Sequence, residues 1–486
     1  MRAVELFSQE ELCGCEWAHD MEINSVAEHS DLAKAGCVFV CHKGSTADGT
    51  SFIPQAYSNG CRAFVSYKKV KAPRDSIVII VKNTRKRAAE LSAALNGNPE
   101  RKLKIIGITG TKGKTTTAEL LYKVLVFSGK KAVLISTLGV SGLPKVKYSL
   151  DNTTPPPSYI FGILRMAKDI GAEYVIIEVS SQSLAEYRVF GIPFCLGIFT
   201  SFSPDHVGDG EHRSVEDYFS AKRRLFTDYG IRVAVVNSCD PSWCEMTRGV
   251  ERVIKCGVSE EDDFRVEKIR CSIFGTEFSM GGKKFSLSLC GKHNAINAAL
   301  AISCASYLTG KPIAFFDKAV TDVRISGRFE IYTLAGRFFV IDFAHNGESV
   351  KKICTEVRTF TPGKIIIVYG SVGKRTFSRR CELAENAEKY ADISVLTADN
   401  PGEESVEKIC RDIGNCYKDS SAFVIVPDRR RAIEYAYSIS KAGDSVILAG
   451  KGHERYQLIG NEKLYFSEEK ILKDMGARAV FCDKTE

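Results

Sequence analysis

A glycine-rich segment between a strand and a helix constrains this chain more than any other feature. It spans residues 107–117, begins as the apolar run 103–108 ends, and leads into residues 118–125, whose apolar positions have helical spacing. In this context the glycines let backbone N–H groups turn toward an anion, and the helix N-terminus adds free N–H groups and a positive dipole end. The pattern predicts a phosphate loop in an α/β sheet, with Lys114 on the β- and γ-phosphates and Thr115 on Mg²⁺.

The loop departs from the strict phosphate-loop pattern at one position. Ile108 stands where the first glycine is expected, and Gly107 lies one residue earlier. The alternative interpretation is an ordinary glycine-rich turn in an α/β sheet. The Gly-Lys-Thr-Thr-Thr run that ends the segment favours the phosphate loop instead.

Length, charge and cysteine content limit the class of protein. A chain of 486 residues predicts about three domains. Its net charge of +8 is dispersed, which suits small anionic substrates and gives little support to nucleic-acid binding. The 17 cysteines lack zinc-site spacing, so we expect reduced thiols in a cytosolic protein. We find no signal-peptide pattern and no apolar run of membrane-spanning length.

The residues before the phosphate loop predict a small α/β domain, residues 1–100. Strands are expected at 38–40, 63–65 and 77–81, and a helix at 84–95, before the turn signal at 96–99. A polar turn lies between the first two strands. The hydrophobic periodicity does not reveal which ligand this domain binds. For the polar turn, a ligand-binding loop and an ordinary surface loop are equal alternatives.

The central domain, residues 101–325, carries polar groups near predicted strand ends. Glu178 ends the strand 174–178 and is a candidate Mg²⁺ ligand, the alternative being an exposed edge glutamate. His206 follows another strand, where a structural histidine is the commoner case. Lys222 lies among basic residues, and the residues alone predict a solvated face. Asn294 and Asn297 share a helix face, with an N-cap role as the alternative for Asn294.

The C-terminal domain, residues 326–486, predicts a parallel, doubly wound sheet. Helical stretches alternate with strands at 338–342, 365–369, 393–397, 422–426 and 445–449. Polar loops follow nearly every strand. Because parallel strands end at one sheet edge, these loops describe a binding edge.

Taken in order, the motifs resemble those of the Mur ligases, the amide-forming enzymes of peptidoglycan synthesis. The resemblance covers nearly the whole chain and rests on an ordered set of motifs: Thr-Gly-Thr-Lys-Gly-Lys-Thr, Asn-Thr-Thr-Pro, Glu-Val-Ser-Ser, Asp-His, Ala-Lys, His-Asn-x-x-Asn, Gly-Arg-Phe-Glu, Asp-Phe-Ala-His, Asp-Asn-Pro and Gly-Lys-Gly-His-Glu. It implies a UDP-binding domain, an ATPase domain and an amino-acid-binding domain. The best match is the branch that adds the third residue of the stem peptide.

The resemblance also implies site residues, cofactors and partners. ATP and two Mg²⁺ ions would be held by Gly110, Thr111, Lys112, Gly113, Lys114, Thr115, Thr116, Glu178 and His206, with Lys222 as a carbamylated metal ligand. Asn294, Asn297, Arg328, Asp342 and His345 would surround the nucleotide. The UDP-linked muramoyl dipeptide would meet Ser25, Lys43, Gly44, Ser45, Thr46, Asp48, Asn152, Thr153, Thr154, Ser180 and Arg188. The amino acid would meet Arg375, Asp399, Asn400, Pro401, Gly402, Gly450 and Glu454. A cytoplasmic monomer that acts on small molecules, without nucleic acid or membrane insertion, is expected.

The implied chemistry follows from charge. ATP phosphorylates a substrate carboxylate to an acyl phosphate, which the incoming amine attacks with loss of phosphate. Lys114 and two Mg²⁺ ions would stabilise the anionic transferring group. Carbamylation would turn Lys222 from a repelling cation into an anionic metal ligand.

Departures from the family pattern bear on the incoming amino acid. The diaminopimelate-adding branch has Asp-Asn-Pro-Arg, whose arginine pairs the distal carboxylate, whereas this chain has Gly402 followed by Glu403 and Glu404. The missing cation and added acids predict L-lysine, although Arg379 and Arg380 leave basic residues nearby. A second departure places Glu186 where a glutamine is usual, which affects one substrate contact.

Three other classes of protein share some of these features. Folylpolyglutamate synthetases share the loop and the chemistry, but their phosphate loop lies near the N-terminus. A switch GTPase needs an Asn-Lys-x-Asp motif, which is absent from the sequence. A non-catalytic Mur-like scaffold is disfavoured because Lys114, Glu178, His206 and Lys222 are all present.

Overall fold

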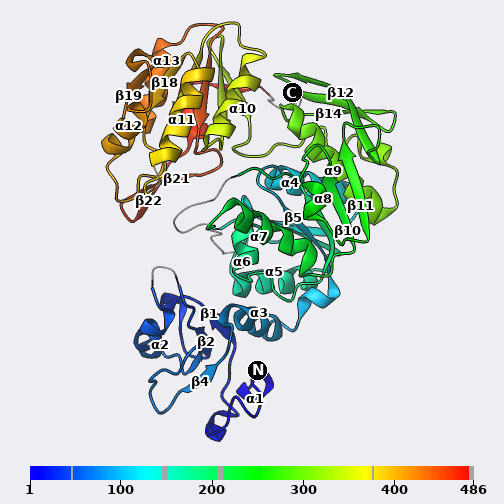
Figure 1. The fold of residues 1–486 in the computed structure, drawn as a ribbon, viewed down its shortest axis with the longest axis vertical. Helices are drawn as coiled ribbons and strands as arrows, with labels where there is room; N and C mark the ends of the chain where they lie inside the picture. The colour runs from blue at the N-terminus through cyan, green and yellow to red at the C-terminus, as the bar shows by residue number, and fades with distance from the viewer. Residues whose placement is uncertain (45–46, 145–151, 205–211, 375–376, 481–486) are drawn as a thin grey trace. The chain divides into compact units, whose positions relative to one another are not determined.

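The fold is described from a computed structural model that covers residues 1–44, 47–144, 152–204, 212–374 and 377–480. Figure 1 shows the ribbon of the chain with its helices and strands labelled. Contacts between residues divide the chain into two compact units. Unit 1 comprises Met1–Val266 and Ile296–Ala319, and unit 2 comprises Glu267–Ala295 and Val320–Glu486. The predicted boundaries at residues 100 and 325 stay predictions. Among the described residues, no helix is long and apolar enough to cross a membrane.

The N-terminal part of unit 1 is a parallel four-stranded sheet. Its strands follow chain order: β1 (Ser25–Ala27), β2 (Cys37–Val40), β3 (Ala63–Ser66) and β4 (Ile77–Ile80). The helices here are α1 (Ala3–Leu6), α2 (Ile53–Ser58) and α3 (Thr84–Leu95). Asn83 caps α3 by accepting a hydrogen bond from the Lys86 N–H. Strands β2, β3 and β4 and helix α3 are those expected from the sequence, whereas β1 was not predicted.

The central sheet of unit 1 places the phosphate loop in its middle. The strand order is β11-β10-β9-β5-β8-β6-β7, and β5 lies between β8 and β9, both parallel to it. The strands are β5 (Lys104–Thr109), β6 (Ala132–Ser136), β7 (Gly139–Ser141), β8 (Tyr174–Glu178), β9 (Phe194–Phe199), β10 (Val233–Asn237) and β11 (Arg252–Gly257), with β12 (Phe264–Ser272) beside β11. The helices are α4 (Lys114–Phe127), α5 (Pro157–Asp169), α6 (Ser181–Ala185), α7 (Val215–Thr227), α8 (Trp243–Met246) and α9 (Lys292–Thr309), whose start up to Ala295 belongs to unit 2.

The strands of this sheet are nearly continuous apolar runs because both faces of the sheet are buried. Val133, Val175 and Ile198 are fully buried, as expected for a parallel sheet covered on both faces. The carboxyl ends of β5, β6, β8 and β9 therefore lie at one edge. That edge receives the loops that begin at Gly110, Thr137, Val179 and Thr200.

Unit 2 contains a second, doubly wound sheet of order β19-β18-β17-β20-β16-β15-β23. Its strands are β15 (Glu330–Leu334), β16 (Arg337–Asp342), β17 (Ile365–Tyr369), β18 (Ile393–Leu396), β19 (Phe423–Ile425), β20 (Ser445–Ala449) and β23 (Arg478–Ala479). The helices are α10 (Gly347–Arg358), α11 (Phe377–Tyr390), α12 (Val406–Gly414), α13 (Arg429–Ile439) and α14 (Glu468–Asp474). Strands β16 to β20 pair in parallel, as predicted.

Two antiparallel hairpins complete unit 2. One is β13 (Gly275–Met280) with β14 (Lys283–Leu287). The other is β21 (Tyr456–Ile459) with β22 (Glu462–Tyr465), which follows the Gly450 loop.

The expectation of reduced thiols throughout is wrong at one pair. Cys381 on α11 and Cys416 just after α12 form a disulfide. Helices α11 and α12 pack together, so they bring these two cysteines within bonding distance although 35 residues separate them. Sequence spacing alone did not reveal the pairing.

Candidate active site

The phosphate loop turns from the end of β5 into the start of α4, as the sequence predicts. Gly110 (φ +149°) and Gly113 (φ +86°) have backbone conformations that side chains rarely adopt. A Cβ at Gly110 would collide with the Thr200 hydroxyl, and one at Gly113 would lie 2.7 Å from Asn297 Oδ1. The Thr111 N–H donates to Ser201 O at 2.7 Å. Both glycines are therefore required by the loop geometry, and the ordinary-turn interpretation is disfavoured.

Two lysine side chains converge on one oxygen of this loop. Lys114 Nζ and Lys222 Nζ each donate to Gly110 O at 2.8 Å. Lys222 is 1% exposed and lies 4.3 Å from the centre of the Tyr218 ring. The interpretation of Lys222 as part of a solvated face is wrong, because the inner face of α7 also carries Ala221 and Leu225. The helix therefore directs Lys222 into the site.

Acidic groups also lie next to the loop. Glu178, fully buried at the end of β8, accepts hydrogen bonds from Thr115 Oγ1 (3.1 Å) and the Thr137 N–H (3.0 Å). Glu178 is thus not an exposed edge glutamate. Burial, and then the charge of Glu178, raise the pKa of Glu119 to about 7. Sequence reasoning missed Glu119, although it stands one helical turn after Thr115 on α4 and so shares its face.

Three predicted substrate residues meet next to Glu178. Thr154 Oγ1 donates to Glu178 O (2.7 Å) and accepts from the Ser180 N–H (3.0 Å). Arg188 Nη1 donates to Thr154 O at 2.8 Å. The same guanidinium forms two hydrogen bonds, of 2.9 and 2.7 Å, with Glu186. Thr153 lies close by, since its Oγ1 is at hydrogen-bond distance, 3.0 Å, from Thr137 Oγ1.

The predicted UDP-binding residues fall into two places. Ser25 pairs with Cys37 at the start of β2, whereas the loop with Lys43, Gly44 and Asp48 follows the end of β2. The structure does not bring Ser25 to that loop. Asp48 accepts hydrogen bonds from Lys68 (2.6 Å) and Tyr67 (2.7 Å), which lower its pKa.

The predicted nucleotide residues are divided between the two units. In unit 1, Asn297 Oδ1 accepts from Thr117 Oγ1 at 3.4 Å, next to the phosphate loop. In unit 2, Asp342 Oδ2 accepts from the Phe329 N–H (2.9 Å), and burial raises the Asp342 pKa. The Arg328 guanidinium lies 4.8 Å from the centre of the Phe343 ring.

Two further nucleotide candidates lie in unit 2. His345 Nδ1 is 2.8 Å from Phe343 O. Asn294 is the third residue of α9, so the N-cap alternative for it is wrong, and its Nδ2 donates to Cys290 O at 2.7 Å.

The predicted amino-acid residues of unit 2 form a buried, charged cluster. Asn400 Nδ2 donates to Glu454 Oε2 (2.8 Å), and Lys451 Nζ donates to both Asn400 Oδ1 (2.8 Å) and Glu454 Oε2 (2.6 Å). Asp399 is 3% exposed and its Oδ1 lies 3.7 Å from Lys451 Nζ. Gly450 (φ +108°) leaves room for Asp399, whose Oδ2 would lie 3.0 Å from a Cβ there.

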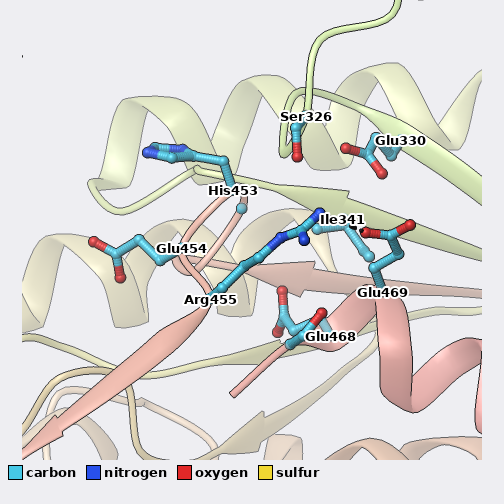
Figure 2. Close-up of a pocket in the computed structure, with 10 residues that line it drawn as sticks. Ser326, Glu330, Ile341, His453, Glu454, Arg455, Glu468 and Glu469 are labelled. Atoms are coloured by element: carbon cyan, nitrogen blue, oxygen red, sulfur yellow. Dashed lines mark hydrogen bonds and ion pairs between the residues drawn. The ribbon is translucent and has the colours of Figure 1, made fainter. Parts of the chain in front are cut away.

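Figure 2 shows a small cavity next to this cluster, with Glu454 in its wall. The Glu454 carboxylate and the Arg455 guanidinium point in opposite directions, and Arg455 reaches toward Glu469, 3.3 Å away. The cavity that they line has a volume of about 10 Å³, room for a single water molecule. Its walls also include His453 and Glu468.

The acids after Gly402 already have cationic partners. Glu403 lies 2.9 Å from Lys374 Nζ, and Glu404 lies 2.7 Å from Arg380, whose side chain is 3% exposed. The Gly402 N–H donates to Leu458 O at 3.0 Å, which ties this loop to the β21–β22 hairpin. The sequence did not reveal these partners, because they lie on separate loops and helices.

Some predicted residues lie outside the described ranges: Ser45, Thr46, His206 and Arg375. Lys112 lies on the phosphate loop and Thr116 lies in the first turn of α4. Asn152 lies before α5, and Pro401 lies in the loop that contains Asp399. Lys451 and Arg429 are functional candidates that sequence reasoning did not single out. Lys451 stands inside the Gly-Lys-Gly-His-Glu motif, which was the available signal.

These features define a class of protein. A phosphate loop at the carboxyl edge of a parallel sheet, flanked by two lysines and by a buried glutamate, is the site of a phosphate-loop nucleotide-dependent enzyme. The comparisons with known proteins identify the family within that class.

The sequence matches the Mur ligase middle domain over residues 108–305, and the glutamate ligase domain of Mur ligases over residues 327–452. The chain belongs to the Mur ligase family and is an ATP-dependent amide ligase. Two similar curated proteins are UDP-N-acetylmuramoyl-L-alanyl-D-glutamate–2,6-diaminopimelate ligases. The Aquifex aeolicus protein is 34% identical, with 93% of each chain covered, and the Clostridium perfringens protein is 33% identical, with 94% and 95% covered.

Solved structures show the same fold. A UDP-N-acetylmuramoyl-L-alanyl-D-glutamate–2,6-diaminopimelate ligase matches with a TM-score of 0.64 and 23% identity, covering 95% of this chain and 96% of that chain. A Mycobacterium tuberculosis folylpolyglutamate synthase matches with a TM-score of 0.61 and 17% identity, covering 76% and 92%. The predicted α/β Mur ligase fold is confirmed. The prediction of L-lysine as the added amino acid is not confirmed, since these curated relatives carry the diaminopimelate name.

Proposed function

We propose that this enzyme joins a diamino acid, L-lysine, to UDP-N-acetylmuramoyl-L-alanyl-D-glutamate in peptidoglycan synthesis. One observation carries the proposal: Lys114 and Lys222 meet on Gly110 O, while Glu178, Thr154 and Ser180 meet at the adjoining strand ends. A site that activates a carboxylate with ATP needs cations, a metal-binding acid and substrate hydroxyls side by side. The names of the curated relatives supply the UDP-linked dipeptide as the substrate class.

The reaction proceeds in two steps. An oxygen of the substrate carboxylate attacks the γ-phosphorus of ATP, the bond to the β-phosphate oxygen breaks, and ADP leaves. The neutral amine then attacks the acyl carbon, the carbon–oxygen bond to phosphate breaks, and the amine loses a proton. Lys114 stabilises the negative charge on the transferring phosphoryl group, because its ammonium stands at the loop that receives the phosphates.

The donor set at the loop fits Mg²⁺. Thr115 and Glu178 offer a hydroxyl and a carboxylate, the hard oxygen ligands that Mg²⁺ prefers, 3.1 Å apart and buried. Mg²⁺ supplies positive charge that stabilises the phosphoryl group during transfer. Thr137 orients Glu178 through its N–H and hydroxyl. His206 belongs to this metal set by the family resemblance alone.

Lys222 fits a carbamate. Its ammonium is buried and shares an oxygen with Lys114, which places two like charges close together in a site that must also hold a cation. Carbamylation removes this repulsion and adds a carboxylate-like ligand for a second Mg²⁺.

The choice of L-lysine rests on Gly402. A distal carboxylate, as in diaminopimelate, needs a cation, and Gly402 provides none. Arg380 is held by Glu404 (2.7 Å) and Asp412 (2.5 Å), so it is not available to replace the arginine. Burying the carboxylate without a partner costs several kcal/mol, on the order of a thousandfold in selectivity. Glu403 and Glu404 contribute less than expected from the sequence, since each already has a cation.

The test is phosphate release with the UDP-linked dipeptide, ATP, Mg²⁺ and a panel of amino acids. We expect kcat/KM for L-lysine to exceed that for meso-diaminopimelate. Gly402→Arg should raise the value for diaminopimelate, and Gly460→Arg, on the adjoining turn, serves as the control because both glycines have positive φ. A preference for diaminopimelate in the parent enzyme would overturn the choice of lysine, and activity only with a folate substrate would overturn the whole proposal.

A further inference from the structure

Five charged side chains are packed together below the carboxyl edge of the unit 2 sheet. Asp399, Lys451, Arg429 and Glu468 are each at most 3% exposed, and Glu454 joins them with a side chain that is 17% exposed. Burying charges at this density is costly unless each has a partner. The pairing of these five side chains therefore shows which groups each cation holds in place.

Lys451 sets the orientation of the amino-acid site. Its ammonium donates to Asn400 Oδ1, which also accepts from the Leu458 N–H at 3.0 Å. With two donors on Oδ1, the Asn400 amide has one orientation, and Nδ2 must face Glu454. Lys451 also donates to Glu454, so one ammonium fixes both residues.

Arg429 holds the two loops from below. Its guanidinium donates to Ala398 O (3.1 Å) and Ala449 O (2.7 Å), the carbonyls directly before Asp399 and Gly450. It also pairs with Glu468 Oε1 at 2.8 Å. The hydrogen bonds of Arg429 therefore go to the backbone and to Glu468. Lys451 is the cation that lies nearest to the Asp399 carboxylate.

The charges of the cluster do not balance. Asp399, Glu454 and Glu468 supply three negative charges when ionised, whereas Lys451 and Arg429 supply two positive charges. Lys451 is at hydrogen-bonding distance from Glu454 but 3.7 Å from Asp399, so Asp399 is the acid with the weaker compensation. Burial raises the Asp399 pKa, as expected for an acid in this position.

We propose that Lys451 is a positioning residue for the acceptor amino acid. It neutralises Glu454, fixes the Asn400 amide, and leaves the Asp399 carboxylate to bind an ammonium group of the incoming amino acid. This inference rests on the proposed function, because it takes Asp399, Asn400 and Glu454 as the amino-acid site. Lys451 itself acts through these residues and need not touch the substrate.

The experiment compares Lys451→Met with Lys463→Met. Both lysines lie about 5 Å from the centre of the Tyr456 ring, at 5.1 and 4.9 Å, but Lys463 is exposed on the hairpin. In Lys451→Met the KM for the amino acid should rise at least about tenfold, with the KM for ATP unchanged. In Lys463→Met both constants should stay at the parent values. An unchanged amino-acid KM in Lys451→Met, or equal changes in both lysine variants, would overturn the proposal.

A second variant separates positioning from folding. Lys451→Met leaves Glu454 buried without its cation, so the double variant Lys451→Met/Glu454→Gln removes both charges while keeping the shape of the glutamate. We expect this variant to melt near the parent temperature and to have a higher amino-acid KM than Glu454→Gln alone, because Glu454 itself is taken as part of the site. A double variant with the same KM as Glu454→Gln alone would show that Lys451 only stabilises the fold. If the parent enzyme ligates none of the amino acids tested, the proposed function has failed, and that result is seen before any variant is made.

Discussion

Replacing Lys222 tests the charge arrangement at the phosphate loop. Lys114 Nζ and Lys222 Nζ each lie 2.8 Å from Gly110 O, so the two nitrogens are at most about 5.6 Å apart. Two unit positive charges at that distance repel by about 3 kcal/mol at an effective dielectric constant of about 20. The proposed carbamate on Lys222 would turn this repulsion into an attraction of similar size.

The size of this repulsion sets the loss of activity that we expect on replacing Lys222. Lys222→Ala should lower kcat for phosphate release by at least about a hundredfold, since about 3 kcal/mol corresponds to a factor of that size. A short carboxylate such as acetate should restore part of the rate by taking the place of the carbamate. Lys222→Arg keeps a cation but cannot form the carbamate, so it should be inactive with or without acetate. Lys123→Ala, an exposed lysine on α4, is the control that should retain parent activity.

A second readout does not depend on activity. Incubation of the parent enzyme with ¹³C-labelled bicarbonate should give a carbamate signal in the ¹³C NMR spectrum, and the signal should be absent in Lys222→Ala. Parent-like turnover by Lys222→Arg, or a labelled spectrum that does not change in Lys222→Ala, would refute the reasoning. Lys222 would then act as a simple cation at Gly110.

Three further predictions concern other parts of the chain. Glu186→Gln removes the carboxylate that engages Arg188, so the KM for the UDP-linked dipeptide should fall severalfold, by about 1 kcal/mol, while Glu245→Gln at the Arg223 pair leaves it unchanged. Reduction of the Cys381–Cys416 disulfide should lower the free energy of unfolding of unit 2 by about 4 kcal/mol, measured in urea, and should have no effect in Cys381→Ser. Burial lowers the pKa of His453 to about 4, so the folded protein resists protonation of this side chain. The free energy of unfolding should be highest above pH 6.5 and fall by up to about 3 kcal/mol as the pH drops toward 4. His453→Gln should remove this pH dependence in melts at different pH values.

The sequence predicted the parts of the site that depend on local pattern. The phosphate loop, Glu178 at a strand end and the polar loops of the C-terminal sheet follow from glycine spacing and apolar runs, and the structure has them where expected. Strand periodicity also predicted the sheet edge at which these groups lie. Local rules suffice here because each group stands within a few residues of the element that positions it.

The environments of charged side chains could not be predicted in the same way. Lys222 looked like a surface lysine because Arg223 and Arg224 follow it directly, yet the helix turns it inward. The acids Glu403 and Glu404 looked like free charges, but their partners Lys374 and Arg380 lie about 25 to 30 residues away in sequence. Pairing across such separations is decided by packing, on which a single sequence carries little information.

The phosphate loop of this enzyme brings a cation and acidic groups to one site. Lys114 stands at Gly110, whereas Glu178 and Glu119 stand at the end of β8 and one turn into α4, and the carbamate proposed for Lys222 would add a further negative charge. A nucleotide bound with its phosphates at Lys114 would present its metal to the acids, because a phosphate and its Mg²⁺ have opposite charges. Reversing that orientation would set phosphate oxygens against the carboxyl groups and Mg²⁺ against the Lys114 ammonium. The loop therefore favours one direction of binding before any base or ribose contact is made.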